Sequence, residues 1–253
     1  MWNDVIDLRD FYRTSLGGVA RRTIRNRIRA TWDNVSGMTV LGVGYATPYL
    51  LPFKEEAQRV IAAMPAQQGV LHWPAEGLGS VTLCDETEIP LPDVSVDRVL
   101  LVHGLECSEQ LRPMLREIWR ILADGGRLLA VVPNRRGIWA RFDRTPFGHG
   151  YPYTPGQLNR LMRDTLFQPI QVSPALFVPP SRSRMVIASA PAWEKIGFRW
   201  FQTFSGVLVI EAGKEIYAAT PEPTRGARRR RYVGVLPRAN RTITQTPETH
   251  RSP

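Results

Sequence analysis

The sequence has few of the residues from which disulfide frameworks and metal sites are built. Its two cysteines, Cys84 and Cys107, stand outside any CxxC pair, and only four histidines are scattered over 253 residues. Neither a disulfide framework nor a zinc site is therefore predicted, and we expect no metal centre.

Long apolar stretches are also missing. No apolar run approaches the roughly 20 residues that a membrane-spanning helix needs. The N-terminal stretch MWNDVIDLRDFYRT mixes acidic and basic residues and has no apolar core of signal-peptide type. We therefore expect a cytoplasmic protein without a transmembrane segment; the sequence does not indicate its oligomeric state.

Acidic residues are outnumbered by basic ones, and the formal net charge is +10. Much of the excess lies in residues 221–253, which hold eight arginines against two glutamates and few large apolar residues. We expect this Arg/Pro-rich tail to be disordered. Its RGARRRR segment suits weak binding to a polyanion such as RNA, DNA or an anionic membrane surface. A tail that merely aids solubility is an equally good interpretation.

Residues 1–37 are predicted to form a basic, helical N-terminal extension. Apolar residues recur every four positions along it, and arginines occupy most of the other faces. The apolar positions are Leu16, Ala20, Ile24, Ile28 and Trp32. We favour a lid helix that docks on the core through this stripe; a polyanion-binding helix is the alternative.

From residue 38 to 220, strand and helix patterns alternate, which predicts an α/β domain with parallel strands joined by helices. Strand patterns cover 38–43, 59–64, 80–84, 97–103, 127–132, 169–173 and 206–211, and helix patterns cover 47–58, 109–121 and 154–166. We expect Thr47 to cap the first of these helices and Pro48 to lie in its first turn. The glycines at 125–126 are expected to cap the second helix.

One stretch of about fifty residues, 84–135, carries several ordered motifs. An acidic residue, Asp85, follows the third strand, and Ile89-Pro90 and Ser95-Val96-Asp97 lead into the fourth. A helix then ends in Arg120-Ile121-Leu122-Ala123-Asp124-Gly125-Gly126 before the fifth strand. In this order and spacing the motifs resemble those of the class I S-adenosylmethionine-dependent methyltransferases, of the broad small-molecule type.

This resemblance implies a Rossmann-like, seven-stranded, mostly parallel sheet with an antiparallel last strand and helices on both faces. It also implies S-adenosylmethionine as the cofactor, bound across the carboxyl ends of the first strands. The cofactor-binding residues that it suggests are Gly42, Gly44, Tyr45, Ala46, Asp85, Glu86 and His103.

The glycine-rich turn TVLGVGYATPYL departs from the family pattern. Gly44 matches the first glycine, but Ala46 and Pro48 replace the next two, and Gly42 stands where the family has an acid. The acid that ends the second strand in the family is replaced by Met64 or Pro65. Two missing hydrogen bonds to charged groups would weaken binding by about 3–6 kcal/mol unless compensated. Trp73 in the following segment could stack on adenine, although we favour a space-filling role.

Candidate catalytic residues come from the loops after the fourth and fifth strands. His149 lies between two glycines in the long loop 133–155, and its imidazole can transfer a proton near neutral pH. Tyr151 could line the acceptor pocket beside it. We name His149 and Tyr151 as catalytic candidates, with an ordered lid as the alternative role of this loop. Glu106 is expected to bond a backbone amide at its turn.

Two functions remain open from the sequence. The first is an S-adenosylmethionine-dependent methyltransferase, an enzyme that acts on a small acceptor, with an anionic acceptor as one option. The second is a methyltransferase-like protein without catalytic activity, which binds RNA, a ribosomal particle or a protein partner through its basic segments. The altered turn favours the second function, whereas the motifs of residues 84–135 and the long loop favour the first.

Overall fold

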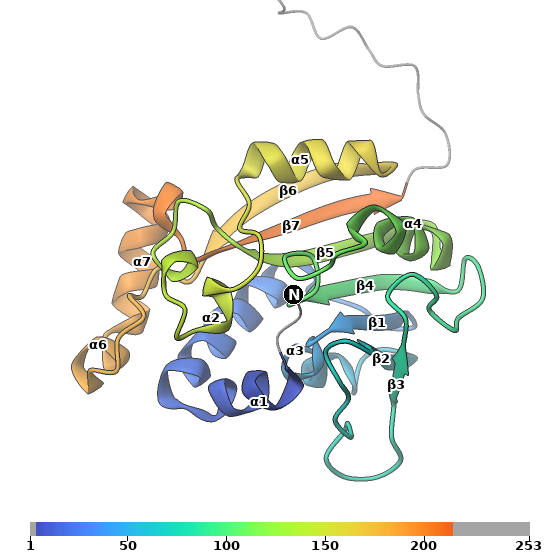
Figure 1. Cartoon of the computed structure of the whole chain (residues 1–253), viewed down its shortest axis with the longest axis horizontal. Coiled ribbons are helices and arrows are strands. Elements are labelled where there is room, and N and C mark those ends of the chain that lie inside the picture. The colour runs from blue at the N-terminus through green and yellow to red at the C-terminus, as the bar shows by residue number, and fades with distance from the viewer. Residues whose placement is uncertain (1–3, 215–253) are drawn as a thin grey trace, which may run out of the picture. The chain divides into compact units, whose positions relative to one another are not determined.

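The computed structural model describes residues 4–214, and the expected tail lies outside them. A seven-stranded sheet runs through this part of the chain in the order β3-β2-β1-β4-β5-β7-β6 (Figure 1). Its strands are β1 (Thr39–Gly44), β2 (Arg59–Pro65), β3 (Val81–Cys84), β4 (Val96–Val102), β5 (Leu122–Pro133), β6 (Phe167–Ala175) and β7 (Val207–Lys214). Only β7 runs antiparallel to its neighbours. The predicted fold class is confirmed.

Alternate side chains of the central strands enter two separate apolar layers, as the two-residue period of a strand requires. One layer takes Val40, Leu100 and Val102 and packs against the N-terminal helices. The other takes Leu41, Val43 and Leu101 and packs against helices from the middle of the chain. Because both faces are covered, the strands read as nearly continuous apolar runs.

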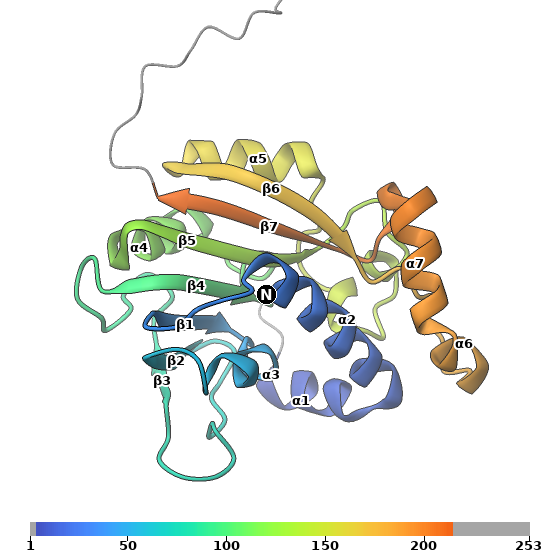
Figure 2. The same ribbon diagram turned by 180° about the vertical axis from the view of Figure 1, so that it is seen from behind.

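Helices cover the two faces of the sheet, as Figures 1 and 2 show from opposite sides. On one face lie α1 (Val5–Arg13), α2 (Ser15–Thr31) and α3 (Thr47–Leu50), and on the other lie α4 (Leu111–Ile121) and α5 (Pro155–Asp164). Two further helices, α6 (Arg184–Ala188) and α7 (Ala190–Trp200), and a short 3-10 helix, η4 (Gln202–Phe204), precede β7.

The predicted apolar stripe of the N-terminal segment docks on the sheet. Ala20, Ile24, Ile28 and Trp32 are buried in the first layer, and Leu16 packs against it. Arg21 and Arg22 are exposed on the outer side. The interpretation as a docked helix is therefore confirmed, although the helix is broken at Thr14, whose side chain accepts a hydrogen bond from Gly17 and caps α2.

Three local predictions were wrong. The helix expected at 47–58 ends at Leu50 and continues only as a 3-10 turn to Phe53, with Pro52, which lacks an amide hydrogen, inside that turn. Ala46 occupies the position before this helix, and Thr47 caps nothing.

The expected glycine cap is also absent, because α4 ends at Ile121 before the glycines. Its last carbonyls, of Arg120 and Ile121, instead accept hydrogen bonds from the amides of Val94 and Ser95.

Candidate active site

The order of the strands reverses between β1 and β4, and in open α/β sheets ligands bind outside the carboxyl ends of the strands at such a switch point. β1 ends at Gly44 and β4 at Val102, which are paired in the sheet. The turns that follow these two strands therefore form the candidate site, which we call the carboxyl edge.

Gly44 is required here by the sheet itself. Its φ is +73°, and an added Cβ would lie 2.4 Å from the carbonyl oxygen of Val102. The same carbonyl accepts the amide hydrogen of Tyr45 at 2.8 Å, so that amide already has a partner. The glycine thus lets the turn after β1 pass tightly against β4, which is a different reason from the open ligand approach that the motif suggests.

A chain of four buried polar side chains crosses the carboxyl edge. The Tyr49 hydroxyl donates to the Tyr12 hydroxyl at 2.8 Å, and Tyr12 lies 2.7 Å from Nε2 of His103. Nδ1 of His103 lies 3.2 Å from a carboxylate oxygen of Glu106. All three hydrogen bonds of this chain are satisfied together when His103 carries its proton on Nδ1 and donates it to Glu106, while Nε2 accepts from Tyr12.

Aromatic rings enclose this chain. The ring of Tyr12 stacks on that of Tyr45, with centroids 5.8 Å apart, and Phe147 lies 4.9 Å from the His103 ring. Burial is the main reason that the pKa of Tyr12 lies well above its usual value, and burial also raises the pKa of Tyr49. Both phenols therefore keep their protons at neutral pH.

The same edge holds buried acceptor atoms without a hydrogen-bond partner among residues 4–214. They are one oxygen each of Gln68, Glu86 and Glu106. Gln68 follows β2, and its amide nitrogen donates to the carbonyl of His103 at 3.1 Å. Glu86 follows β3, and its other oxygen accepts from the Ser108 hydroxyl at 2.9 Å. Burial raises the pKa of Glu86.

Several residues proposed from the sequence meet at this edge, and others do not. Gly42, Gly44, Tyr45, Ala46, Glu86 and His103 are all buried there. Asp85 is exposed, and its carboxylate accepts two hydrogen bonds from Thr87, which hold its pKa below the usual value. Glu106 binds His103 and not a backbone amide, so that part of its prediction was wrong.

The two predicted catalytic residues lie outside the buried chain. His149 and Tyr151 are exposed, although the amide of Tyr151 donates to the carbonyl of Glu106 at 2.8 Å. The loop 133–155 therefore covers the edge with Phe147 directed inward and His149 directed outward. Tyr153, whose pKa burial raises to about 12, also lies against the turn at Leu105.

Sequence reasoning missed Tyr12 and Tyr49 of the chain, and Gln68 beside it. Val5, Leu8 and Tyr12 follow one another at helical spacing and are all buried, so an apolar stripe that ends in a tyrosine was the available signal. Gln68 gives no comparable signal, because its role depends on a contact with His103, which is 35 residues away in sequence. Trp73 packs half-buried against the first apolar layer, as a space-filling residue does.

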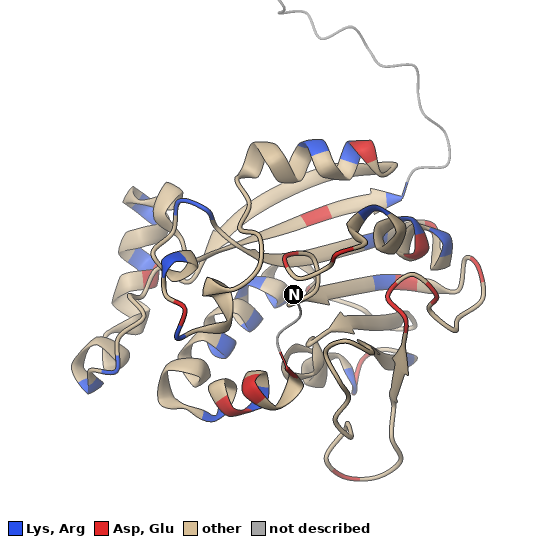
Figure 3. Ribbon diagram, in the orientation of Figure 1, with Lys and Arg blue, Asp and Glu red and all other residues tan. Residues whose placement is uncertain are grey.

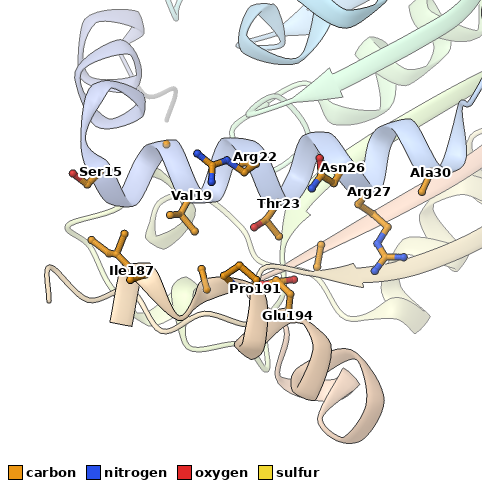
Figure 4. Close-up of a pocket in the computed structure, with 14 residues that line it drawn as sticks. Ser15, Val19, Arg22, Thr23, Asn26, Arg27, Ala30, Ile187, Pro191 and Glu194 are labelled. Carbon is orange, nitrogen blue, oxygen red and sulfur yellow. The ribbon is translucent and has the colours of Figure 1, made fainter. Parts of the chain in front are cut away.

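Three neighbouring cavities form a groove beside α1 and α2. The largest, about 850 Å³, lies between α2 and α6–α7, where Arg22, Arg27 and Glu194 meet Val19 and Ile187 (Figure 4). The second, about 570 Å³, shares Ser15 and Ile187 with it.

The third cavity of this groove, about 220 Å³, shares Phe11, Arg144 and Thr145 with the second. It is lined by residues of α1 and of the loop 133–155, among them Leu8 and His149. Its volume suits part of a small molecule, and Arg144 places a cation in its wall.

Comparison with known proteins agrees with this arrangement. Residues 41–130 match the family model of a methyltransferase domain. Over 139 residues the chain is 27% identical to the ubiquinone/menaquinone biosynthesis C-methyltransferase of Rubrivivax gelatinosus. That match covers 54% of this chain and 53% of the relative, so it spans about half of the relative's length.

Solved structures show the same fold. A SAM-dependent methyltransferase from Thermotoga maritima superposes with a TM-score of 0.59 and 18% identity, covering 83% of this chain and 96% of that one. A geranyl diphosphate C-methyltransferase from Streptomyces coelicolor, solved with S-adenosyl-L-homocysteine, superposes with a TM-score of 0.53 and 15% identity over 75% of this chain and 77% of that one. The predicted resemblance is thus confirmed: residues 41–130 match a methyltransferase domain, and the described residues have the fold of the class I S-adenosylmethionine-dependent methyltransferases, whose cofactor is S-adenosylmethionine.

Proposed function

We propose that the protein transfers a methyl group from S-adenosylmethionine to a small acceptor that binds in the groove beside α1. The observation that carries this proposal is the carboxyl edge at the β1–β4 switch point, which lies within the matched residues 41–130. When bound, the cofactor supplies an electrophilic methyl group.

The buried acceptor atoms of the edge suit this cofactor. S-adenosylmethionine presents an ammonium group, two ribose hydroxyls and an adenine amine, all of which are hydrogen-bond donors. Gln68, Glu86 and Glu106 each offer an oxygen that has no other partner among the described residues. These three oxygens would replace the acids that the sequence lacks at Gly42 and at the end of β2.

The His103–Glu106 pair provides a place for a proton. With Nδ1 held by Glu106, Nε2 of His103 is the basic atom of the edge, and in the structure it faces the Tyr12 hydroxyl. A proton released by the methyl acceptor would reach Nε2 of His103 through the Tyr12 hydroxyl. Because the pKa of Tyr12 is high, this hydroxyl would pass a proton on without remaining ionised.

The groove supplies the acceptor site. Its smallest cavity brings Arg144, His149 and Asp143 beside the apolar side chains of Leu8 and Phe11. Because the wall also carries the carboxylates of Asp7 and Asp143 against one guanidinium, it suits a small molecule with an apolar body and polar groups, and its charge does not select an anion. His149 and Tyr151 remain proposed contacts of the acceptor at this exposed end of the site.

Calorimetric titration of the full-length protein with S-adenosylmethionine and S-adenosylhomocysteine tests the proposal. We expect micromolar binding that Glu86→Gln weakens about 10- to 100-fold, because it removes a charged acceptor. Asp85→Ala should weaken binding as well. Glu88→Gln is the matched control, since Glu88 is exposed two residues away and should leave affinity unchanged.

Absence of binding at millimolar cofactor, in protein shown to be folded and free of ligand, would contradict the enzymatic function. The catalytically inactive alternative would then gain support if RNA were retained in a salt-sensitive manner and lost on removal of residues 221–253. Equal affinities of the Glu86→Gln and Glu88→Gln variants would instead refute only the role given to the buried oxygens.

A further inference from the structure

The segment from α6 to η4 exposes an unusual number of large apolar side chains. Between 41% and 82% of the surface of each is accessible. They are Met185, Trp193, Ile196, Trp200, Phe201 and Phe204, which we call the aromatic patch. Phe198 is exposed as well, but it lies on the opposite side of α7, under the guanidinium of Arg27. Monomeric soluble proteins rarely expose so many large apolar groups together, and such a concentration marks an interaction site.

The helix α7 is attached to the core by a different set of residues. Its buried positions are Ala190 and Gly197, and the ring of Phe177 lies where a Cβ of Gly197 would be. Between them, the Glu194 carboxylate accepts hydrogen bonds from the amides of residues 176–178. Small residues and hydrogen bonds thus hold the helix, and its largest side chains contribute little to the core.

Three residues of the patch form a stripe along α7. Trp193, Ile196 and Trp200 are spaced by three and four residues and therefore share one side of the helix. At 100° per residue this side lies about a quarter turn from the buried side. The helix α7 therefore presents an apolar stripe to the solvent. Between 41% and 70% of the surface of each side chain in this stripe is exposed.

The charges around the patch have one sign. Arg182, Arg184, Lys195 and Arg199 are exposed. Figure 3 shows the basic positions of this segment of the ribbon in blue. The only acid between residues 180 and 206 is Glu194. It is half-buried, and its carboxylate accepts hydrogen bonds from backbone amides. A partner of this surface must therefore be anionic as well as apolar.

The combination of exposed apolar side chains and positive charge limits which partners can bind this surface. A second copy of the chain would bring the same cations face to face across a two-fold axis, which is unfavourable. Residues 221–253 carry eight arginines and would be repelled in the same way. Single-stranded RNA would stack on the aromatic rings, but not on Ile196 or Met185.

We infer that the aromatic patch docks on an anionic lipid bilayer. Tryptophan and phenylalanine side chains on the apolar side of a basic helix enter the boundary between headgroups and acyl chains, and arginines and lysines beside them bind anionic headgroups. Trp200, with 70% of its surface exposed against 41% for Trp193, is the tryptophan of the patch most available to enter the bilayer. This surface is separate from the cofactor edge, so the inference stands independently of the proposed methyl transfer.

Vesicle co-sedimentation of the full-length protein tests the inference. The vesicles contain either phosphatidylcholine alone or equal parts of phosphatidylcholine and phosphatidylglycerol. We expect binding to the mixed vesicles, and the double variant Ile196→Ser/Trp200→Ser should bind on the order of ten- to a hundredfold more weakly because two apolar insertions are lost. Brominated lipids should quench the fluorescence of the wild type, and Trp200→Phe should remove much of that quenching.

The matched control is Leu78→Ser/Ile170→Ser, which removes two exposed apolar side chains elsewhere and should bind as the wild type does. The substitutions keep every charge, so binding through the arginines of residues 221–253 alone would be equal in all three proteins and would overturn the inference. No binding of the wild type to mixed vesicles would do the same. So would a dimer, seen by sedimentation equilibrium, that dissociates in Ile196→Ser/Trp200→Ser.

Discussion

The hydrogen-bond chain at the carboxyl edge predicts an unusual result for paired substitutions. Tyr12→Phe removes one hydroxyl but leaves two buried groups stranded, that is, without a hydrogen-bond partner: the Tyr49 hydroxyl and Nε2 of His103. Each stranded group costs about 1–3 kcal/mol, so the single change should lower the free energy of unfolding by about 2–6 kcal/mol. Tyr49→Phe removes only a donor to Tyr12 and should cost about 0.5–1.5 kcal/mol.

The double variant Tyr12→Phe/Tyr49→Phe strands His103 alone and should cost about 1–3 kcal/mol, less than Tyr12→Phe by itself. Urea unfolding of the wild type and the three variants, followed by circular dichroism, measures these differences. If the cost of the double variant equals the sum of the single costs within about 0.5 kcal/mol, the chain is not a coupled network and the reasoning is refuted.

Three further predictions rest on other contacts. Burial holds the pKa of Tyr12 and Tyr49 above the value near 10 of an unfolded tyrosine, so the folded state binds more protons above that pH. The free energy of unfolding should therefore fall by about 1 kcal/mol for each of the two residues between pH 10 and 11, and in urea unfolding the double phenylalanine variant should lose about 2 kcal/mol less than the wild type over this interval. Gly44→Ala should cost at least about 2 kcal/mol more than Gly37→Ala, since both have positive φ but only Gly44 would place a Cβ against Val102; equal melting temperatures would contradict this. Glu194→Ala should cost about 2–3 kcal/mol and speed hydrogen exchange of the amides of residues 176–178, whereas unchanged exchange would show that α7 is held by other contacts.

The sheet could be predicted because its information is local. Runs such as Val40–Val43 and Val99–Val102 are apolar at every position, which indicates strands buried on both faces. The ordered motifs of residues 84–135 then resembled a family in which the strand order is known. Both signals lie within a few residues of the elements that they define.

The helix α7 could not be found in this way. Hydrophobic periodicity detects a helix by its apolar buried side, but the buried side of α7 consists of Ala190, Glu194 and Gly197. Its tryptophans point outward, which reverses the usual pattern. The chain of polar residues at the carboxyl edge was equally hidden, because Tyr12 and His103 are 91 positions apart in the sequence.

Some of the residues proposed for the site lie at the carboxyl edge for a reason that the motifs did not suggest. Gly44 matched a ligand-binding motif, yet its neighbour in the structure is the backbone of β4. His103 was proposed from its place after the fourth strand, and the structure gives it two partners that no motif specifies. The roles of these residues in cofactor binding stay predictions that the titrations above can test.

The bond between Tyr12 and His103 has a consequence for the order in which the protein is made. During synthesis α1 leaves the ribosome first, and its buried side, with Val5, Leu8 and Tyr12, has no complete partner until β4 and the turn at His103 have followed. The helix α1 therefore cannot bury this side until the segment that contains His103 has been synthesised. A shortened chain that begins at residue 38 would retain every strand of the sheet and yet leave His103 without its phenol.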